Sequence, residues 1–278
     1  MPQATVDRCV VEQAHDHHVA GRDRLGDRAG ARSAALFREL GGRWGLLKAT
    51  GVLSALAEVA GDYAEAARLR RDGLRMAEEL GLWIEVSYVL SGLGRIALLT
   101  GDHARADELH GRAMRLAARH SHRRGEQFAE VGLGLSARRQ GRLDDAETHL
   151  RRWLEWCRQI DGDMGAALIL AELGFIAEQR GDAEAALATH LEGYAAARAT
   201  DDPRAIALAQ EGLAGAHALA GRYEEASRLL ATATAHRESA GTPLPPAERG
   251  DVDRIEALLR GSVADPPFAH RGSGALPS

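Results

Sequence analysis

The sequence predicts an all-helical protein, an α-solenoid built from stacked antiparallel helix pairs. The chain has 278 residues, and aromatic side chains make up only 4% of them. Alanine, leucine, arginine and glutamate dominate instead, a composition that favours helices over sheets. Glycines recur every forty residues, with small and apolar residues in register around them. A repeat of this length is typical of solenoids, in which neighbouring units bury each other's apolar faces.

The recurring glycines mark a turn inside each repeat unit. They stand at Gly21, Gly61, Gly101, Gly141, Gly181 and Gly221. After the last five, acidic side chains follow within a few residues. A glycine ends a helix because it adopts the left-handed conformation at little cost, and acidic residues suit the positive end of the next helix. Each glycine is therefore predicted to separate two helices.

Three further columns predict how the two helices of a unit pack. A leucine lies eight residues before each glycine, at Leu53, Leu93, Leu133, Leu173 and Leu213. A small residue follows each leucine, at Ser54, Gly94, Gly134, Gly174 and Ala214. An alanine lies five residues after each glycine, at Ala66, Ala106, Ala146, Ala186 and Ala226. Small side chains let two helix backbones approach closely, so each unit is predicted to be an antiparallel pair.

These columns divide the chain into four predicted segments. Residues 43–242 hold five complete units, and 1–42 are a degenerate unit that caps the N-terminal end. Prolines end the array, and 243–260 are predicted to form a C-terminal capping helix, because the last unit of a solenoid has an unburied face. Residues 261–278 are rich in glycine, proline and serine and are predicted to be disordered.

The columns over residues 43–242 resemble the tetratricopeptide repeat, with its leucine and small residue, its turn glycine and its later alanine. The usual period of that family is nearer to about 34 residues. The longer units resemble the C-terminal repeats of MalT-like and AfsR-like bacterial transcriptional regulators, as does the string at 242–249. The resemblance implies a right-handed superhelix that holds a partner in a concave groove.

No complete catalytic or cofactor-binding motif accompanies the repeats. A phosphate-binding GxxxxGK[ST] loop needs a lysine before a hydroxyl residue, but the only lysine, Lys48, precedes Ala49. No HExxH, GxSxG or SxxK string occurs, and Cys9 and Cys157 have no metal-type spacing. The sequence predicts a non-catalytic protein without cofactor or metal. An enzyme that uses an inner-wall carboxylate or arginine is the less favoured alternative.

Charge and hydropathy narrow the partners and the compartment. The net charge of −5 argues against a nucleic-acid partner, because phosphate binding needs clustered positive charge. No stretch approaches eighteen consecutive apolar residues, and the N-terminus lacks a basic region before an apolar run. We therefore expect no membrane partner and a cytoplasmic location.

The resemblance also predicts which side chains line the groove, at set offsets from the leucine column in the first helix of each pair. Aromatic and arginine side chains are enriched at interfaces because they combine area, stacking and directed hydrogen bonds. The strongest candidates of this kind are Tyr88, Arg95, Phe128, Arg138 and Phe175. Apolar and acidic neighbours on the same wall are Val131, Leu135, Leu168 and Glu178.

Two glutamates interrupt the repeat columns. Glu130 stands in a column that elsewhere holds leucine, and Glu172 stands in a column of glycines. Either carboxylate could receive a ligand amine, although pairing with a nearby arginine is the simpler interpretation.

The predicted partner is a peptide, a protein segment or a small effector, held by a regulatory or scaffold protein. The alternative is a small-molecule-binding accessory protein of a bacterial biosynthetic pathway. An enclosed cavity would favour the alternative and an open trough the leading hypothesis. A homodimer remains possible, because an uncapped apolar end would favour one.

Overall fold

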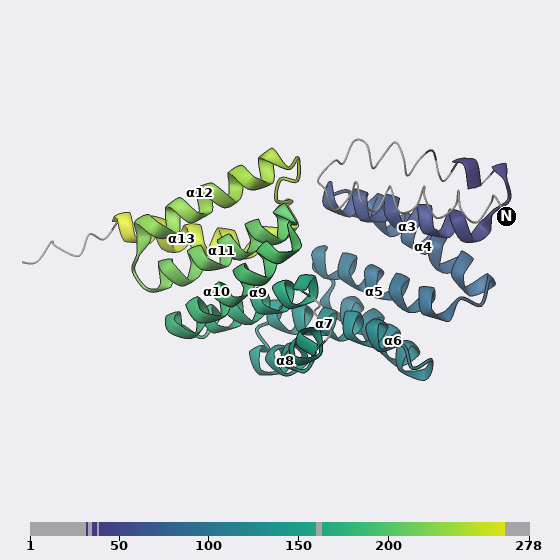
Figure 1. Cartoon of the computed structure of the whole chain (residues 1–278), viewed down its shortest axis with the longest axis horizontal. Coiled ribbons are helices and arrows are strands. Elements are labelled where there is room, and N and C mark those ends of the chain that lie inside the picture. The colour runs from purple at the N-terminus through teal and green to yellow at the C-terminus, as the bar shows by residue number, and fades with distance from the viewer. Residues whose placement is uncertain (1–31, 33–34, 38, 160–162, 265–278) are drawn as a thin grey trace, which may run out of the picture.

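A computed structural model describes residues 32, 35–37, 39–159 and 163–264, and these residues contain helices and no strand. Residues 1–31 and 265–278 lie outside the described part of the chain. The helices, drawn in Figure 1, are α3 (Arg43–Val59), α4 (Tyr63–Glu79), α5 (Trp83–Leu99), α6 (His103–Arg119), α7 (Arg123–Arg139), α8 (Leu143–Gln159), α9 (Asp163–Gln179), α10 (Ala183–Thr200), α11 (Pro203–Leu219), α12 (Tyr223–Ser239), the 3-10 turn η1 (Pro246–Glu248) and α13 (Gly250–Ala264). None of these helices is both long and apolar enough to cross a membrane.

Each forty-residue unit consists of two equal halves, because successive helices from α3 to α12 begin twenty residues apart. The turns within the pairs lie at the predicted glycines, with φ of 78° at Gly61 and 83° at Gly101. The turns between pairs use the same left-handed geometry, for example at Gly81. Ser121 and Asp201 adopt it in two of those turns, with φ of 51° and 54°. These two residues interrupt the second glycine series and hide the half-unit period in the sequence.

The turn at Gly61 illustrates how each helix ends and the next begins. The Gly61 N–H donates to the Glu58 carbonyl oxygen at 3.1 Å, and the Asp62 N–H donates to that of Ala57 at 2.8 Å. These bonds satisfy carbonyls that the end of α3 would otherwise leave unpaired. The Asp62 carboxylate then accepts from the Glu65 N–H at 3.0 Å and caps α4. Asp102 and Asp182 cap α6 and α10 in the same way, whereas the acidic residues after Gly141 and Gly221 lie in the first turns of α8 and α12.

The small-residue columns bring the helices of each pair together, as predicted. The alanine column is fully buried from Ala66 to Ala226. A methyl group on Gly94 would lie 2.8 Å from the imidazole of His110, and one on Gly132 would lie 2.2 Å from it. His110 therefore fills a slot between two units. His190 fills the equivalent slot two units later, between Gly174 and Gly212.

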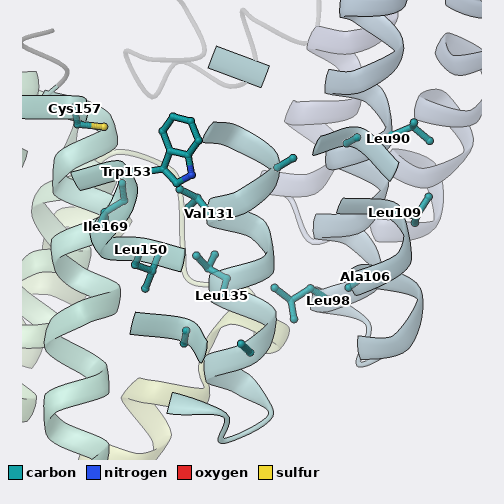
Figure 2. Packing of buried hydrophobic residues seen from close by; sticks show 14 of the residues in the cluster. Leu90, Leu98, Ala106, Leu109, Val131, Leu135, Leu150, Trp153, Cys157 and Ile169 are labelled. Carbon is teal, nitrogen blue, oxygen red and sulfur yellow. The ribbon is translucent and has the colours of Figure 1, made fainter. Parts of the chain in front are cut away.

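The main core extends through the middle units (Figure 2). Trp153 of α8 is fully buried and contacts Trp156 edge to face, with ring centroids 5.7 Å apart. Cys157 on the same helix is 1% exposed and is a small buried side chain. A separate cluster at the C-terminal end places Ile255 of α13 against Ala214 of α11. Helix α13 thus covers the last pair.

The helix pairs follow an arc, with α3 at one end, α12 at the other and a gap between them (Figure 1). Helices α6, α8 and α10 lie on the outer side of the arc, and α5, α7 and α9 lie on the inner side. The segment between α12 and α13 returns to the first unit, where the Pro245 Cβ lies 3.6 Å from the place of a Cβ on Gly61. The C-terminal segment therefore bridges the two ends of the arc.

Candidate functional site

The inner wall of the arc is formed by the first helix of each pair, and it has two halves. One half lies near the C-terminal ends of α5, α7 and α9, and the other lies near their N-terminal ends. Residues 243–254 of this chain, named the strap here, lie against the first half. The strap includes η1 and the start of α13, and its charged side chains contact three successive wall helices.

The ion pairs between strap and wall form a regular series. Glu248 accepts from Arg95 of α5 at 3.3 Å. Asp251 accepts from both terminal nitrogens of Arg138 of α7, at 3.1 and 2.9 Å. Arg254 donates to a carboxylate of α9, Glu178, at 2.6 Å. Three of the predicted groove residues are therefore paired with the protein's own C-terminal segment.

Each of the two wall arginines also has a carboxylate partner on a neighbouring wall helix. Arg95 pairs with Glu58 of α3, and Arg138 pairs with Glu172 of α9 at 2.5 Å. Burial would lower the pKa of the Arg138 guanidinium, but Glu172 and Asp251 raise it above its ordinary value. The same balance, with Glu58 as the strongest carboxylate, raises the pKa of Arg95. Both guanidinium groups are fixed in the charged state.

The remaining predicted residues of this half belong to the protein interior. Phe175 is 1% exposed, contacts the imidazole of His190 edge to face, and has the Arg138 guanidinium over its ring at 5.2 Å. Glu178 is also buried and lies 2.8 Å from His190 Nε2. These side chains therefore position the wall and hold the strap.

The other half of the wall is open and carries an aromatic pair. Phe128 is 49% exposed, and its ring meets the half-buried ring of Tyr88 edge to face at 5.9 Å. Burial raises the pKa of the Tyr88 hydroxyl. Val131 and Leu135, on the same helix as Phe128, are 8% and 7% exposed and belong to the core. Of the predicted apolar residues, Phe128 therefore offers the largest free surface.

The open half extends along the N-terminal ends of the wall helices. Ile84 lies one helical turn before Tyr88 and is 44% exposed. Trp44 has the equivalent position in α3 and is 48% exposed. Leu168 continues the wall on α9 and is half-buried. The sequence analysis missed Trp44 and Ile84, although Ile84 lies four residues before the predicted wall residue Tyr88 and so shares its helix face.

Glu130 has a structural role. Its carboxylate accepts from the Trp153 indole N–H at 2.6 Å and from Arg152 at 3.2 Å, and it lies 3.3 Å from His149 Nδ1. Glu130 is 6% exposed. The interpretation that both unusual glutamates pair with nearby arginines thus agrees with the structure, since Glu172 meets Arg138.

The Cys157 thiol of α8 is not activated as a nucleophile. Burial raises the pKa of the Cys157 thiol, which is the opposite of what a nucleophile needs. Across 32, 35–37, 39–159 and 163–264, no cluster of three or more metal-binding side chains could hold an ion.

Comparisons with known proteins agree with this architecture. A family model for the tetratricopeptide repeat matches residues 127–199. Curated protein sequences give no match. The crystal structure of Rap protein complexed with Competence and Sporulation Factor is 11% identical, with a TM-score of 0.65 over 92% of this chain and 87% of that one. NprR in complex with its cognate peptide NprX is also 11% identical, with a TM-score of 0.65 over 97% of this chain and 75% of that one.

A third similar structure belongs to a larger protein. It is a signal transduction ATPase with numerous domains that has a tetratricopeptide repeat sensor, from Pyrococcus horikoshii. The identity is 13% and the TM-score is 0.57, over 91% of this chain and 38% of that one. At these identities the comparisons establish the fold, which is a helical-repeat solenoid of tetratricopeptide type.

Proposed function

We propose that this chain is a non-catalytic binding module that holds a peptide or protein segment along the inner wall. The aromatic pair of the exposed Phe128 and the half-buried Tyr88 carries the proposal. A half-exposed phenylalanine packed against a tyrosine supplies rigid apolar area at low entropic cost, as interface anchors do. Ile84 and Trp44 continue the exposed apolar surface toward the first unit.

A polypeptide fits this wall better than a small molecule. Exposed apolar positions recur on three successive wall helices, α3, α5 and α7. A ligand that contacts all of them must therefore be extended. The other half of the wall already holds a polypeptide segment of this chain, the strap. The likeness in fold to structures solved with Competence and Sporulation Factor and with a cognate peptide adds support.

One cavity favours the second candidate, a small-molecule-binding accessory protein. It has a volume of about 440 Å³ and lies between α8, α9 and α10. Leu154, Leu170 and Ile176 line it, with charged residues around them. These leucines and the isoleucine are nearly fully buried, so the cavity offers little apolar surface. Small-molecule binding is therefore the second candidate function.

Several finer features belong to the same proposal. We place the protein in the bacterial cytoplasm as a regulatory or scaffold module, either alone or as the sensor part of a MalT-like regulator. We assign residues 1–42 to an N-terminal cap and keep a homodimer as an option. We assign no nucleic-acid or membrane partner.

The test uses peptides from a proteolysed extract of the source organism. Peptides retained by the immobilised protein would be identified by mass spectrometry, synthesised and titrated. Replacing Tyr88 and Phe128 by alanine together is expected to weaken binding at least about 10-fold, which corresponds to about 1.4 kcal/mol. The matched control is Tyr223→Ala, an aromatic residue that is 41% exposed at the start of α12. Equal affinity of all three proteins, with unchanged circular dichroism, would overturn the proposal.

A further inference from the structure

We propose that the strap is an intramolecular ligand of the inner wall, and that the partner is an acidic peptide that displaces it. The carboxylates of the peptide would take the places of Glu248 and Asp251 on Arg95 and Arg138. This inference rests on the proposed function, because it names the class of peptide that the same wall binds.

The spacing of the strap residues matches the spacing of the wall helices. Glu248, Asp251 and Arg254 are three residues apart, and they pair in order with α5, α7 and α9. Asp251 and Arg254 share one face of α13, and Glu248 precedes them at the end of η1. The strap therefore contacts three repeat units in succession, as a ligand that lies along a solenoid does.

The contacts with the wall are separate from the capping role of α13. Ile255 is fully buried and packs against Ala214 and Ala218 of the last pair. The charged residues lie on the strap before it and contact other units. Asp251 and Arg254 belong to the same helix as Ile255, so displacing the strap requires the first turns of α13 to move while Ile255 and the residues after it keep the apolar cover.

The wall can lose the strap without leaving either arginine unpaired. Arg95 keeps Glu58 and Arg138 keeps Glu172, both of which belong to the wall itself. A buried ion pair gains little net free energy, because desolvation offsets most of the Coulombic attraction, whereas an unpaired buried charge is costly. Exchange of one carboxylate for another is therefore energetically accessible.

The strap is also an imperfect ligand. Three buried polar atoms where it meets the wall lack a hydrogen-bond partner among the described residues: Glu248 Oε1, Arg254 Nε and Tyr63 Oη. Burial raises the pKa of the Tyr63 hydroxyl, and Glu248 raises it further. Each orphaned atom costs free energy that a better-fitting ligand would recover.

The charge of the wall selects an acidic ligand. Arginines outnumber carboxylates at this end of the wall, with Arg95, Arg138, Arg139 and the adjoining Arg70 of α4 against Glu58, Glu172 and Glu178. Arg139 is exposed and has no ion-pair partner in the described ranges. Arginine binds carboxylates through paired N–H donors, as Arg138 binds Asp251. A peptide with two carboxylates, for Arg95 and Arg138, therefore matches this end of the wall, and Glu178 accepts a basic residue as it accepts Arg254.

The test uses a fluorescently labelled synthetic peptide with the sequence of residues 243–256 and measures its anisotropy with the full-length chain. In the variant Glu248→Gln with Asp251→Asn, the tethered strap is weakened. The labelled peptide is expected to bind this variant at least about 10-fold more tightly than it binds the unaltered protein. A peptide with Gln and Asn at the same two positions is expected to bind the variant at least about 10-fold more weakly than the acidic peptide.

Two results would overturn the inference: equal affinity of the acidic and neutral peptides for the variant, or binding of neither. If the double variant loses helicity by circular dichroism, Glu248→Gln alone replaces it, because Glu248 makes a single 3.3 Å contact with Arg95. The assay uses no natural partner, so a failure of the Tyr88 and Phe128 experiment leaves it interpretable. Conversely, a strap peptide that fails to bind leaves the aromatic pair as a binding site.

Discussion

Asp251 of α13 accepts hydrogen bonds from both terminal guanidinium nitrogens of Arg138 of α7, at 2.9 and 3.1 Å, across 113 residues of sequence. The pair joins the C-terminal cap to the inner wall of the third unit. A residue expected to face a ligand is thus bound by the chain itself, so ligand binding and C-terminal structure are linked at Arg138.

Removing this pair should lower stability at neutral pH but not in acid. Burial would raise the pKa of the Asp251 carboxyl, but Arg138 lowers it below its ordinary value. A carboxyl of this kind stabilises the fold above its unfolded pKa, and the effect is lost as the pH falls through its folded value. We expect Asp251→Asn to cost about 1–3 kcal/mol at pH 7, measured by urea unfolding. The difference from the unaltered protein should shrink below about pH 4. A constant difference down to about pH 3 would contradict this explanation.

His110 should make the protein sensitive to mild acid. Burial lowers the pKa of its imidazole from 6.5 to about 4. Between these values the unfolded chain binds a proton that the folded protein does not, so stability falls as the pH drops from 6.5 towards 4. We expect this loss to approach about 3 kcal/mol and to disappear in His110→Leu with Ser91→Ala. The serine hydroxyl lies 3.1 Å from the imidazole, and Leu150 already has the equivalent position in the next unit.

Unfolding midpoints measured from pH 7 to about pH 4 would test the His110 prediction. Parallel curves for the variant and the unaltered protein would assign the acid sensitivity to other groups.

The bond between Trp153 and Glu130 should appear as a coupling energy. Glu130→Leu restores the residue of the neighbouring units but leaves the buried indole N–H without its acceptor, and Trp153→Phe leaves the carboxylate without this donor. We expect each single variant to lose about 1–3 kcal/mol of unfolding free energy. The double variant should lose less than the sum of the two losses. Additive losses in denaturant titrations would contradict a direct interaction.

Two helical glycines should respond to alanine in opposite ways. A methyl group on Gly132 would lie 2.2 Å from the His110 ring, whereas one on Gly51 meets nothing within 4 Å. We expect Gly132→Ala to destabilise the protein by about 1–3 kcal/mol through overpacking. Gly51→Ala should stabilise it by up to about 1 kcal/mol, since alanine favours the helix. Thermal melts would compare the two, and a stabilising Gly132→Ala would show that the slot is looser than described.

The sequence predicted the features of the fold that depend on local chemistry. Gly61 and its equivalents were recognisable because a left-handed turn favours glycine, and Ala66 and its equivalents because close helix packing needs small side chains. The half-unit period was missed because Ser121 and Asp201 adopt the same turn without being glycines. The exposed aromatic pair was predicted through the resemblance, and Trp44 and Ile84 were missed beside it.

The strap could not be predicted from repeat columns. Its contacts depend on the curvature of the whole arc, which brings the last unit near the first, and columns describe only relations between adjacent units. Arg138 and Phe175 were chosen for their residue types, yet Phe175 is 1% exposed and contacts His190 and Arg138. Arg138 is 4% exposed and pairs with Glu172 of α9 and Asp251 of the strap. The inner wall was predicted from the sequence, but the strap that lies against it was not.

The contact of Glu248 with Arg95 spans 153 residues and changes how the array should respond to force. In an ordinary solenoid each unit contacts only its neighbours, so the array extends like a spring and its end units fray separately. Here the strap also joins units that are not neighbours. Tension on the two ends would act on the ion pairs of Glu248 and Asp251 before it separates the helix pairs, so the protein should not lengthen until those ion pairs break.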